Sequence, residues 1–460
     1  MKLLNINSGF IILLLLIICS GSISCKKYLE IKPDSKLAVP SSLSDLQAIL
    51  DYTNLMNLQT TPCSGEASAD DYFLLEPTYL SFTEAYRNIY SWKIKDYNFP
   101  NDWSKAYSPV FNANYCLEQV EKIPVTGTTK LQWENIKGSS LFFRSYYFMH
   151  LLWAFSKAYD SASFNKDMGI VLRLGSDFNV PSKRASVKEC YDRVIEDAKL
   201  SATYLPDYPL HVMRPSKGAA YGLLAKAYLS MRVYDSAFKY ADLCLKIKNE
   251  LIDYNGDPDI NGSIDAGIPF KRFNKETIFY SEMNSNSFII APGLAKADTF
   301  LYSMYDSNDL RKTAFFLPKG SYYTFKNVYT GGNYYYFSGI ATDEIYLVKA
   351  ECIARKGNAT AAMDELNSLL IKRWKSGTFI PLTASNASEA LNVILKERRK
   401  ELLMRGVRWM DIKRLNKENA NITLIRRIGG QIYRLEPNAN YYALPLPADI
   451  IKTSGIPQNE

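Results

Sequence analysis

Histidine is scarce in this sequence, which contains 2 histidines, His150 and His211, against 33 tyrosines. Because histidine is a common general base and metal ligand, its scarcity weakens hypotheses of acid–base or metal-dependent catalysis. Motifs for a serine nucleophile elbow, a phosphate-binding loop and an H-E-x-x-H zinc helix are also missing, and no carboxylate pair stands out. His150 lies in an aromatic stretch and is expected in the core. We therefore expect no enzymatic activity, no metal and no cofactor.

Cysteines are few and scattered. The 7 cysteines include no C-x-x-C pair, so the spacing of a metal site is absent. Four of them, Cys116, Cys190, Cys244 and Cys352, lie in helix-like stretches, where a small buried thiol is expected. Cys63 is expected in a loop.

Dense runs of basic residues are missing outside one C-terminal stretch. The formal net charge of +8 is modest and spread along the chain, which argues against a nucleic-acid partner. The abundant tyrosines favour a different kind of ligand. Each tyrosine offers an apolar ring face and a hydroxyl group, a combination suited to amphipathic molecules such as sugars or peptides.

A hydrophobic run long enough to span a bilayer is also lacking near the N-terminus. Phe10–Ile18 is unbroken but too short, and the small residues that follow it lead to Cys25. This pattern predicts a lipoprotein signal peptide over residues 1–24 and lipidation of Cys25. Cys19 is an alternative acceptor, although the bulky Ile18 precedes it, and a plain secretory signal is a second alternative.

Apolar residues at helical spacing dominate the rest of the chain. They predict a helix that starts at Ser42 and further helices over about Trp103–Ile123, Lys137–Tyr159 and Glu189–Leu205, with Pro109 starting or kinking the second of them. The fold class is therefore expected to be mainly α.

Two later segments, Gly218–Lys246 and Asp343–Leu370, align with each other. Ala225 and Ala237 in the first have the same separation as Ala350 and Ala362 in the second. Small residues at these positions are typical of tetratricopeptide (TPR) hairpins, in which two antiparallel helices pack closely. Long insertions separate the two segments, so they are not tandem repeats.

Two segments, Thr60–Asp102 and Ile252–Gly339, lack a clean period and are rich in aromatic and polar residues. Long irregular segments in compact proteins are often functional, so we expect these two to meet and form a shallow ligand site. Short alternating runs over Tyr322–Tyr329 and Asn333–Phe337 predict a small β-hairpin around Gly331–Gly332. The candidate ligand residues, with Tyr72 and Trp92 as partly exposed stacking platforms, are Asp71, Tyr72, Tyr90, Trp92, Asn284 and Phe288.

The basic C-terminal stretch Lys396–Arg414 combines an apolar helical stripe with charged residues. Charges on a buried stripe are costly unless paired. We therefore expect a structural ion-pair cluster that satisfies its charges internally or on backbone carbonyls and contains Glu397, Arg398, Glu401, Arg408 and Asp411.

The same stretch, read as E-R-x-x-E-L followed by G-x-R-W-x-D-x-x-R, resembles the C-terminal signature of the SusD/RagB family, the nutrient-binding outer-membrane lipoproteins of Bacteroidetes. Cys25, the Glu189–Pro206 helix, both hairpins and the Pro445–Asn459 tail agree with it in order. One departure is Arg405, where the family often has an acidic residue.

The resemblance implies one domain over residues 25–460, with an N-terminal part at about 25–215 and a C-terminal part at about 216–460. In it, TPR-like helical hairpins form a scaffold beside a loop-rich ligand lobe with a few short strands.

The resemblance also implies a cell-surface protein, lipid-anchored to the outer membrane. Such a protein captures oligosaccharides, or alternatively peptides, and passes them to a SusC-like TonB-dependent outer-membrane transporter. The family has no shared ligand motif, so the candidate ligand residues rest on chemistry alone. A TPR-type scaffold that binds only proteins or peptides is the main alternative, and a secreted glycoside hydrolase is a further one.

Overall fold

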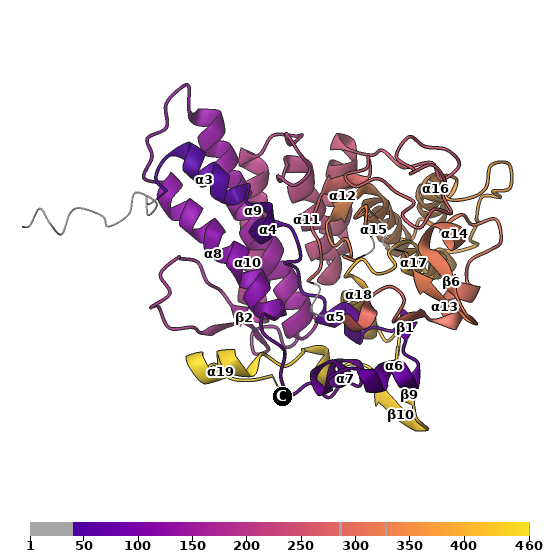
Figure 1. Ribbon diagram of the computed structural model, residues 1–460. Helices are drawn as coiled ribbons and strands as arrows, with labels where there is room; N and C mark the ends of the chain where they lie inside the picture. The colour runs from indigo at the N-terminus through magenta and orange to yellow at the C-terminus, as the bar shows by residue number, and fades with distance from the viewer. Residues whose placement is uncertain (1–39, 285–287, 327–328, 333, 460) are drawn as a thin grey trace, which may run out of the picture. The chain divides into compact units, whose positions relative to one another are not determined.

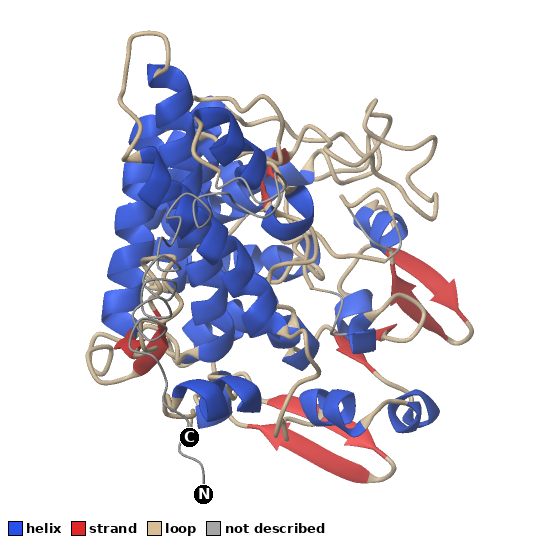
Figure 2. Ribbon diagram, turned by 60° about the vertical axis from the view of Figure 1, so that its left-hand side comes forward, coloured by secondary structure: helices blue, strands red, loops and turns tan. Residues whose placement is uncertain are grey.

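The computed structural model of the protein describes residues 40–284, 288–326, 329–332 and 334–459. The predicted signal peptide and Cys25 lie outside the described residues. Residues from Leu43 to Glu460 form one compact unit, and the following description concerns that unit. Helices dominate it, and its short strands lie among loops (Figure 2). The prediction of a mainly α fold is confirmed.

Long helices pack in succession along the chain, each against the next except for the last one (Figure 1). They are α8 (Asp102–Val120), α9 (Lys130–Phe155), α10 (Val187–Tyr204), α11 (Lys217–Ser230), α12 (Tyr234–Ile247), α15 (Thr342–Arg355), α16 (Ala359–Leu370), α17 (Ala387–Glu401) and α18 (Arg408–Asn416). Shorter helices are α3 (Leu43–Leu50), α4 (Thr53–Met56), α5 (Ser64–Ser68), α6 (Glu76–Ser81), α7 (Glu84–Tyr90), α13 (Thr299–Ser303), α14 (Arg311–Phe315), α19 (Ala448–Ser454), and the 3₁₀ turns η1 (Phe288–Ile290) and η2 (Asn440–Tyr442).

Local sequence explains where several helices begin. At the start of α10 the Glu189 backbone N–H donates to the Ser186 hydroxyl, and the Ser186 backbone N–H donates to the Glu189 carboxylate, at 3.2 and 2.8 Å. This reciprocal pair satisfies two backbone donors that the helix leaves free. Asn101 and Ser104 form the same arrangement before α8. Pro109 lies inside α8 and does not start it.

The two predicted hairpins are present as α11 with α12 and α15 with α16. Ala225, Ala237, Ala350 and Ala362 are all fully buried, so the small residues lie where the helices pack. Gly222 on α11 has a similar role. A Cβ atom there would lie 2.7 Å from Cγ2 of Ile340, and the absent side chain lets the neighbouring strand approach the helix.

Ten short strands form five antiparallel pairs among the described residues. The pairs are β1 (Tyr72–Phe73) with β5 (Lys296–Ala297), β2 (Met168–Val171) with β3 (Arg184–Ser186), β4 (Thr277–Phe279) with β8 (Ile340–Ala341), β6 (Phe316–Lys319) with β7 (Tyr322–Phe325), and β9 (Leu424–Ile428) with β10 (Gln431–Leu435).

The prediction of a hairpin around Gly331–Gly332 is wrong. The observed hairpin in this region is β6–β7, in which Lys319 pairs with Tyr322 across a two-residue turn. Gly320 begins this turn with φ of +63°, a conformation that glycine adopts without a steric penalty. Phe337, expected in the second strand, instead bridges Glu282.

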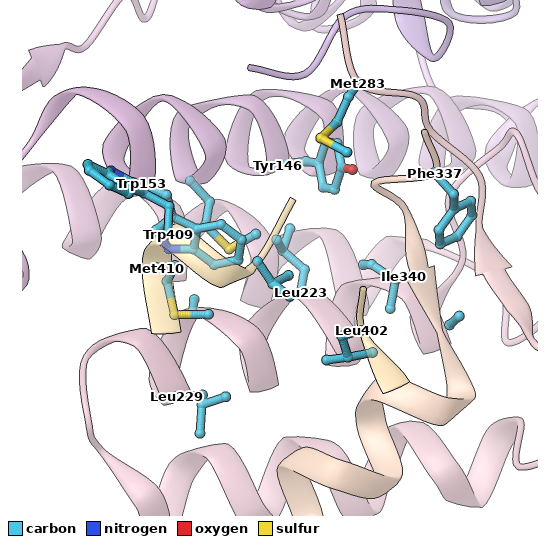
Figure 3. Packing of buried hydrophobic residues seen from close by; sticks show 14 of the residues in the cluster. Tyr146, Trp153, Leu223, Leu229, Met283, Phe337, Ile340, Leu402, Trp409 and Met410 are labelled. Carbon is cyan, nitrogen blue, oxygen red and sulfur yellow. The ribbon is translucent and has the colours of Figure 1, made fainter. Parts of the chain in front are cut away.

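Apolar side chains from segments far apart in the sequence meet in the core (Figure 3). Trp153 of α9 lines one small space with Trp409 and Met410 of α18. His150 is buried on α9, as expected. The four cysteines predicted in helices are buried there, and Cys63 is buried in the loop before α5.

The predicted ion-pair cluster is buried, but its pairing is only partly as expected. Arg398 Nε lies 2.8 Å from the Asp411 carboxylate, as the sequence indicates. Glu397 and Glu401 instead bind Arg311, a residue from a distant segment, at 2.6 and 2.9 Å. Between α17 and α18 the chain turns at Gly406, with φ of +74°.

The remaining members of the C-terminal stretch also pair with distant residues. Arg408 binds Asp70 at 2.7 Å, and Arg405 lies 3.0 Å from Asp343. Arg405 therefore has a carboxylate partner of its own, and the departure from the family pattern at this position is accommodated locally.

The C-terminal tail is attached to the helical scaffold by side-chain amides. Asn459 donates to the carbonyls of Phe155 and Leu444 at 2.8 and 2.7 Å, and it accepts a hydrogen bond from Arg184 at 2.8 Å. Gln458 binds both the N–H and the C=O of Leu446. These contacts give the terminal Gln-Asn pair a structural role.

Within the described residues, each helix is too short or too polar to cross a membrane. The same residues contain no group of three or more His, Cys, Asp or Glu side chains placed to hold a metal ion.

Candidate ligand-binding site

The two aromatic-rich segments come together, as the sequence predicts. Thr61 pairs with Met283 in a short parallel bridge, and strand β1 pairs with β5. The rings of Phe73 and Tyr322 meet edge to face with their centroids 5.3 Å apart. The first segment is more regular than expected, because it forms α5, α6, α7 and β1.

Tyr72, Tyr90 and Trp92 are buried, with exposed fractions of 1%, 1% and 8%. The expectation that Tyr72 and Trp92 are partly exposed stacking platforms is therefore wrong. The reason is Arg426 of β9, whose guanidinium lies 4.7, 4.3 and 5.4 Å from the three ring centroids. The ring faces that we expected to bind a ligand are occupied by an internal cation–π contact.

The polar atoms of these aromatic residues are also used internally. Tyr72 donates to the Ala67 carbonyl at 2.5 Å, and Trp92 donates to the Ser68 carbonyl at 3.0 Å. Asp71 is likewise buried, and its carboxylate lies 2.8 Å from Arg399. The aromatic residues therefore join the first segment to β9, and Asp71 joins it to the C-terminal stretch. None of them lines the cavity described next.

A cavity of about 700 Å³ opens in the second segment, and we call it the lobe cavity. Its size falls within the range of small-molecule sites. It is lined by Gly267, Met283, Asn284, Ile290, Ala291, Pro292, Gly293, Leu294, Leu317, Lys319, Thr324, Phe325, Lys326, Tyr334, Tyr335 and Tyr336. The residues come from the stretch around η1, from the β6–β7 hairpin and from the chain before β8.

Three consecutive tyrosines differ in how they face the lobe cavity. Tyr334 is 82% exposed, whereas Tyr336 is 7% exposed and donates to the Ile290 carbonyl at 2.5 Å. Tyr335 is half-buried. An exposed ring beside an anchored one offers a flat apolar face to a ligand at little cost in folding.

Of the residues predicted from sequence, Asn284 lines the lobe cavity. Its side chain donates to Asp102 at 3.3 Å and its backbone N–H to the Thr61 carbonyl at 2.8 Å, so two residues of the first segment hold it in place. Phe288 begins η1 beside the lining residue Ile290. The ligand roles of Asn284 and Phe288 stay predictions.

Two lysines of the lining, Lys319 and Lys326, bring positive charge to the lobe cavity. Lys326 is buried, and its ammonium donates to the carbonyls of Asp265 and Thr313 at 2.9 and 2.8 Å. Burial lowers the pKa of Lys326. Lys296 donates to the carbonyl of the lining residue Gly293 at 3.0 Å. The pKa of Lys296 is lowered mainly by burial and, to a smaller extent, by repulsion from Lys319.

The sequence analysis missed Tyr334, Tyr335 and the lysines of the lobe cavity. The Y-Y-Y run at 334–336 was the available signal, but it was assigned to a hairpin strand. The lysines carry no signal of their own, because nothing local distinguishes them from the other basic residues of the chain.

Comparisons with known proteins all find similarity to one family, the SusD family. A family model described as "starch-binding associating with outer membrane" matches residues 27–229, and a model of the SusD family matches residues 342–454. A SusD-like protein from Formosa agariphila is 23% identical over 426 residues, covering 78% of this chain and 79% of that protein.

Solved structures share the fold. A putative sugar-binding protein from Bacteroides vulgatus is 20% identical with a TM-score of 0.73, over 92% of this chain and 99% of that one. A SusD superfamily protein from Bacteroides thetaiotaomicron has the same identity and TM-score, over 91% and 100% of the two chains. A SusD-like carbohydrate-binding protein from B. vulgatus is 18% identical with a TM-score of 0.66, over 90% and 97%.

Proposed function

The chain belongs to the SusD family, and from this premise we propose that it captures oligosaccharides at the cell surface and passes them to a TonB-dependent outer-membrane transporter of the SusC kind. The lobe cavity is the proposed binding site, and the chain acts as a binding protein and not as an enzyme. The model descriptions and the relatives' names, which refer to starch, sugar and carbohydrate binding, support this class of ligand.

The observation that carries the proposal is the combination of shape and lining in the lobe cavity. A volume of about 700 Å³ accommodates several sugar rings, and tyrosine faces pack against the C–H surfaces of sugars while amides and hydroxyls bind their polar groups. An aromatic pocket on the loop side is what distinguishes the uptake hypothesis from a TPR-type scaffold.

Replacing Tyr334 with alanine is expected to weaken oligosaccharide binding by about 1–3 kcal/mol, the range for an anchor side chain at a binding hot spot. The free energy of unfolding should change little because the ring is 82% exposed. Isothermal titration calorimetry measures the affinity, with a ligand chosen from an array of neutral and acidic oligosaccharides, and thermal unfolding measures the stability.

Phe178→Ala is the matched control, because Phe178 is 81% exposed and does not line the lobe cavity. Its affinity should equal that of the wild type. Equal affinities for Tyr334→Ala and the wild type would count against the lobe cavity as the site.

The main alternative, a scaffold for protein or peptide partners, would use a different surface of the protein. A groove across the hairpin helices α12, α15 and α16 is lined by residues that include Phe238, Lys349 and Glu365. Lys349 forms ion pairs with Asp242 and Glu365 across it. Peptide binding that is abolished by Phe238→Ala and untouched by Tyr334→Ala would favour the scaffold.

Membrane attachment is proposed to depend on Cys25. A lipid chain on this residue would supply an anchor, so we expect Cys25→Ala to move the protein from the detergent phase to the aqueous phase. Phase partitioning of cell extracts measures this. Cys19→Ala is the control and should leave the protein in the detergent phase; equal retention of the Cys25→Ala variant would rule out this anchor.

A further inference from the structure

The charged groups of the lobe cavity have one sign. Lys319 and Lys326 line it, Lys296 lies directly behind Gly293, and no Asp or Glu side chain is among the described lining residues. The six internal residues outside the described ranges are serine, asparagine and valine, so none of them carries a carboxylate. The exposed Asp265, which attracts Lys326, is the acidic neighbour.

Lys296 and Lys326 are buried, whereas Lys319 is exposed, and the two buried lysines lack the carboxylate partners that most buried cations have. Elsewhere in the fold buried charges are paired, as Lys226 is with Glu344 at 2.7 Å. In the described part of the chain, no carboxylate lies within 4.0 Å of the ammonium of Lys296, Lys319 or Lys326. Two of the three ammonium groups bind backbone carbonyls only, which leaves donors available because an ammonium has three.

A buried cation without a counter-charge is unfavourable. The lowered pKa values of Lys296 and Lys326 express this cost. An anionic ligand in the cavity would remove the cost by supplying the missing charge, whereas a neutral sugar would leave it. The arrangement therefore favours anionic ligands over neutral ones of the same shape.

We propose that the lobe cavity binds an acidic oligosaccharide, with a carboxylate or sulfate group held by Lys326 and Lys319 and a sugar ring placed against Tyr334. This inference rests on the proposed function and narrows its substrate class. Carboxylate and sulfate share the chemistry that the lysines recognise, so the two classes are separated by experiment.

The test is binding of the wild type and of two variants to an array holding uronic-acid oligosaccharides, their methyl esters and sulfated oligosaccharides. The methyl ester is a matched neutral ligand, because it removes the charge of the acid and adds only a methyl group. Acidic members should bind at least about tenfold more tightly than their neutral counterparts, since hydrogen bonds between charged groups are stronger than neutral ones. The affinity should fall as salt is added. Preference for the uronic-acid or the sulfated members identifies the anionic group.

Lys326→Met and Lys319→Met should each reduce the affinity for the acidic ligand on the order of tenfold and leave that for a neutral ligand unchanged. Methionine preserves much of the buried stem of Lys326, and Lys319 is exposed, so at least one variant keeps its fold. Lys95→Met, an exposed lysine outside the lining, is the control.

Tight binding of neutral members, or acidic binding that neither lysine variant weakens, would overturn this inference and leave oligosaccharide capture standing. An array on which nothing binds would contradict the proposed function, and the inference with it.

Discussion

Replacing Asp411 with alanine is expected to lower the free energy of unfolding by roughly 3–5 kcal/mol, the cost of removing one partner from a buried ion pair. Asp411 accepts from Arg398 and Arg414 at 2.8 and 2.7 Å. Arg414 keeps a second carboxylate, Glu351, at 2.6 Å. Arg398 is left with Glu344, whose carboxylate is 3.6 Å away.

The loss should be large because Arg398 is 1% exposed and an arginine does not relieve its burial by losing a proton. Chemical denaturation measures the change. Asp192→Ala is the control, since its ion pair with Lys188 has the same close geometry, 2.6 Å, on an exposed surface. Its loss should stay within about 0.5 kcal/mol.

Similar losses for Asp411→Ala and Asp192→Ala would contradict the interpretation of the cluster as a structural element. A loss of oligosaccharide affinity with unchanged stability would make it a binding site instead.

Glu66→Gln is expected to raise the stability of the protein at alkaline pH. Glu66 of α5 is 3% exposed, and in the described structure neither of its carboxylate oxygens has a hydrogen-bond partner. Burial, and then repulsion from Asp71, raises the pKa of Glu66 from 4.5 to about 8. The folded state therefore favours the protonated acid over the carboxylate.

The sign of the pH dependence follows from this difference. Below pH 4.5 the group is protonated in both the folded and the unfolded state, so it adds no pH dependence. As the pH rises toward 8, the unfolded chain loses the proton first and the folded state loses stability, by up to roughly 5 kcal/mol at about 1.4 kcal/mol per pH unit. Glutamine stays neutral and avoids this loss.

Chemical denaturation of the wild type and the variant from pH 4 to pH 9 measures the difference between their free energies of unfolding. The contributions of the other titrating groups are the same in both proteins and cancel in this difference. The curves should meet at low pH and separate above it. Glu84→Gln, at an exposed position, controls for the loss of one charge. If the free energies of unfolding of Glu66→Gln and the wild type changed in parallel with pH, the raised pKa of Glu66 would be contradicted.

Regular elements could be predicted because their signals are local. The apolar face and the Ser186–Glu189 cap fix α10 from its own sequence, and the alanine spacing predicts the two hairpins. Even the Arg398–Asp411 pair follows from local spacing, because the two residues lie on successive helices joined by a short turn.

Long-range partners could not be predicted in this way. Nothing near Trp92 indicates that Arg426, far along the chain, inserts among the aromatic rings and covers them. Glu401 similarly binds Arg373 and Arg311 from distant segments, at 2.7 and 2.9 Å. In such cases the sequence shows which residue types are present, and the fold decides which of them meet.

The lobe cavity could be predicted only in part. Its segment and the residue Asn284 were expected, but its hairpin was placed at the wrong turn. Gly320-Ser321 and Gly331-Gly332 are both acceptable two-residue turns between aromatic stretches, and local rules do not rank them. Placing the turn at Gly320 leaves Tyr334 outside the hairpin, with its ring exposed at the cavity.

A crystal structure of the mature chain with the tightest-binding oligosaccharide of the array tests the central claim most directly. The ligand should lie in the lobe cavity, with a sugar ring against Tyr334 and an acidic group within hydrogen-bonding distance of Lys326 or Lys319. A ligand bound in the groove of α12, α15 and α16, with the lobe cavity empty, would contradict it.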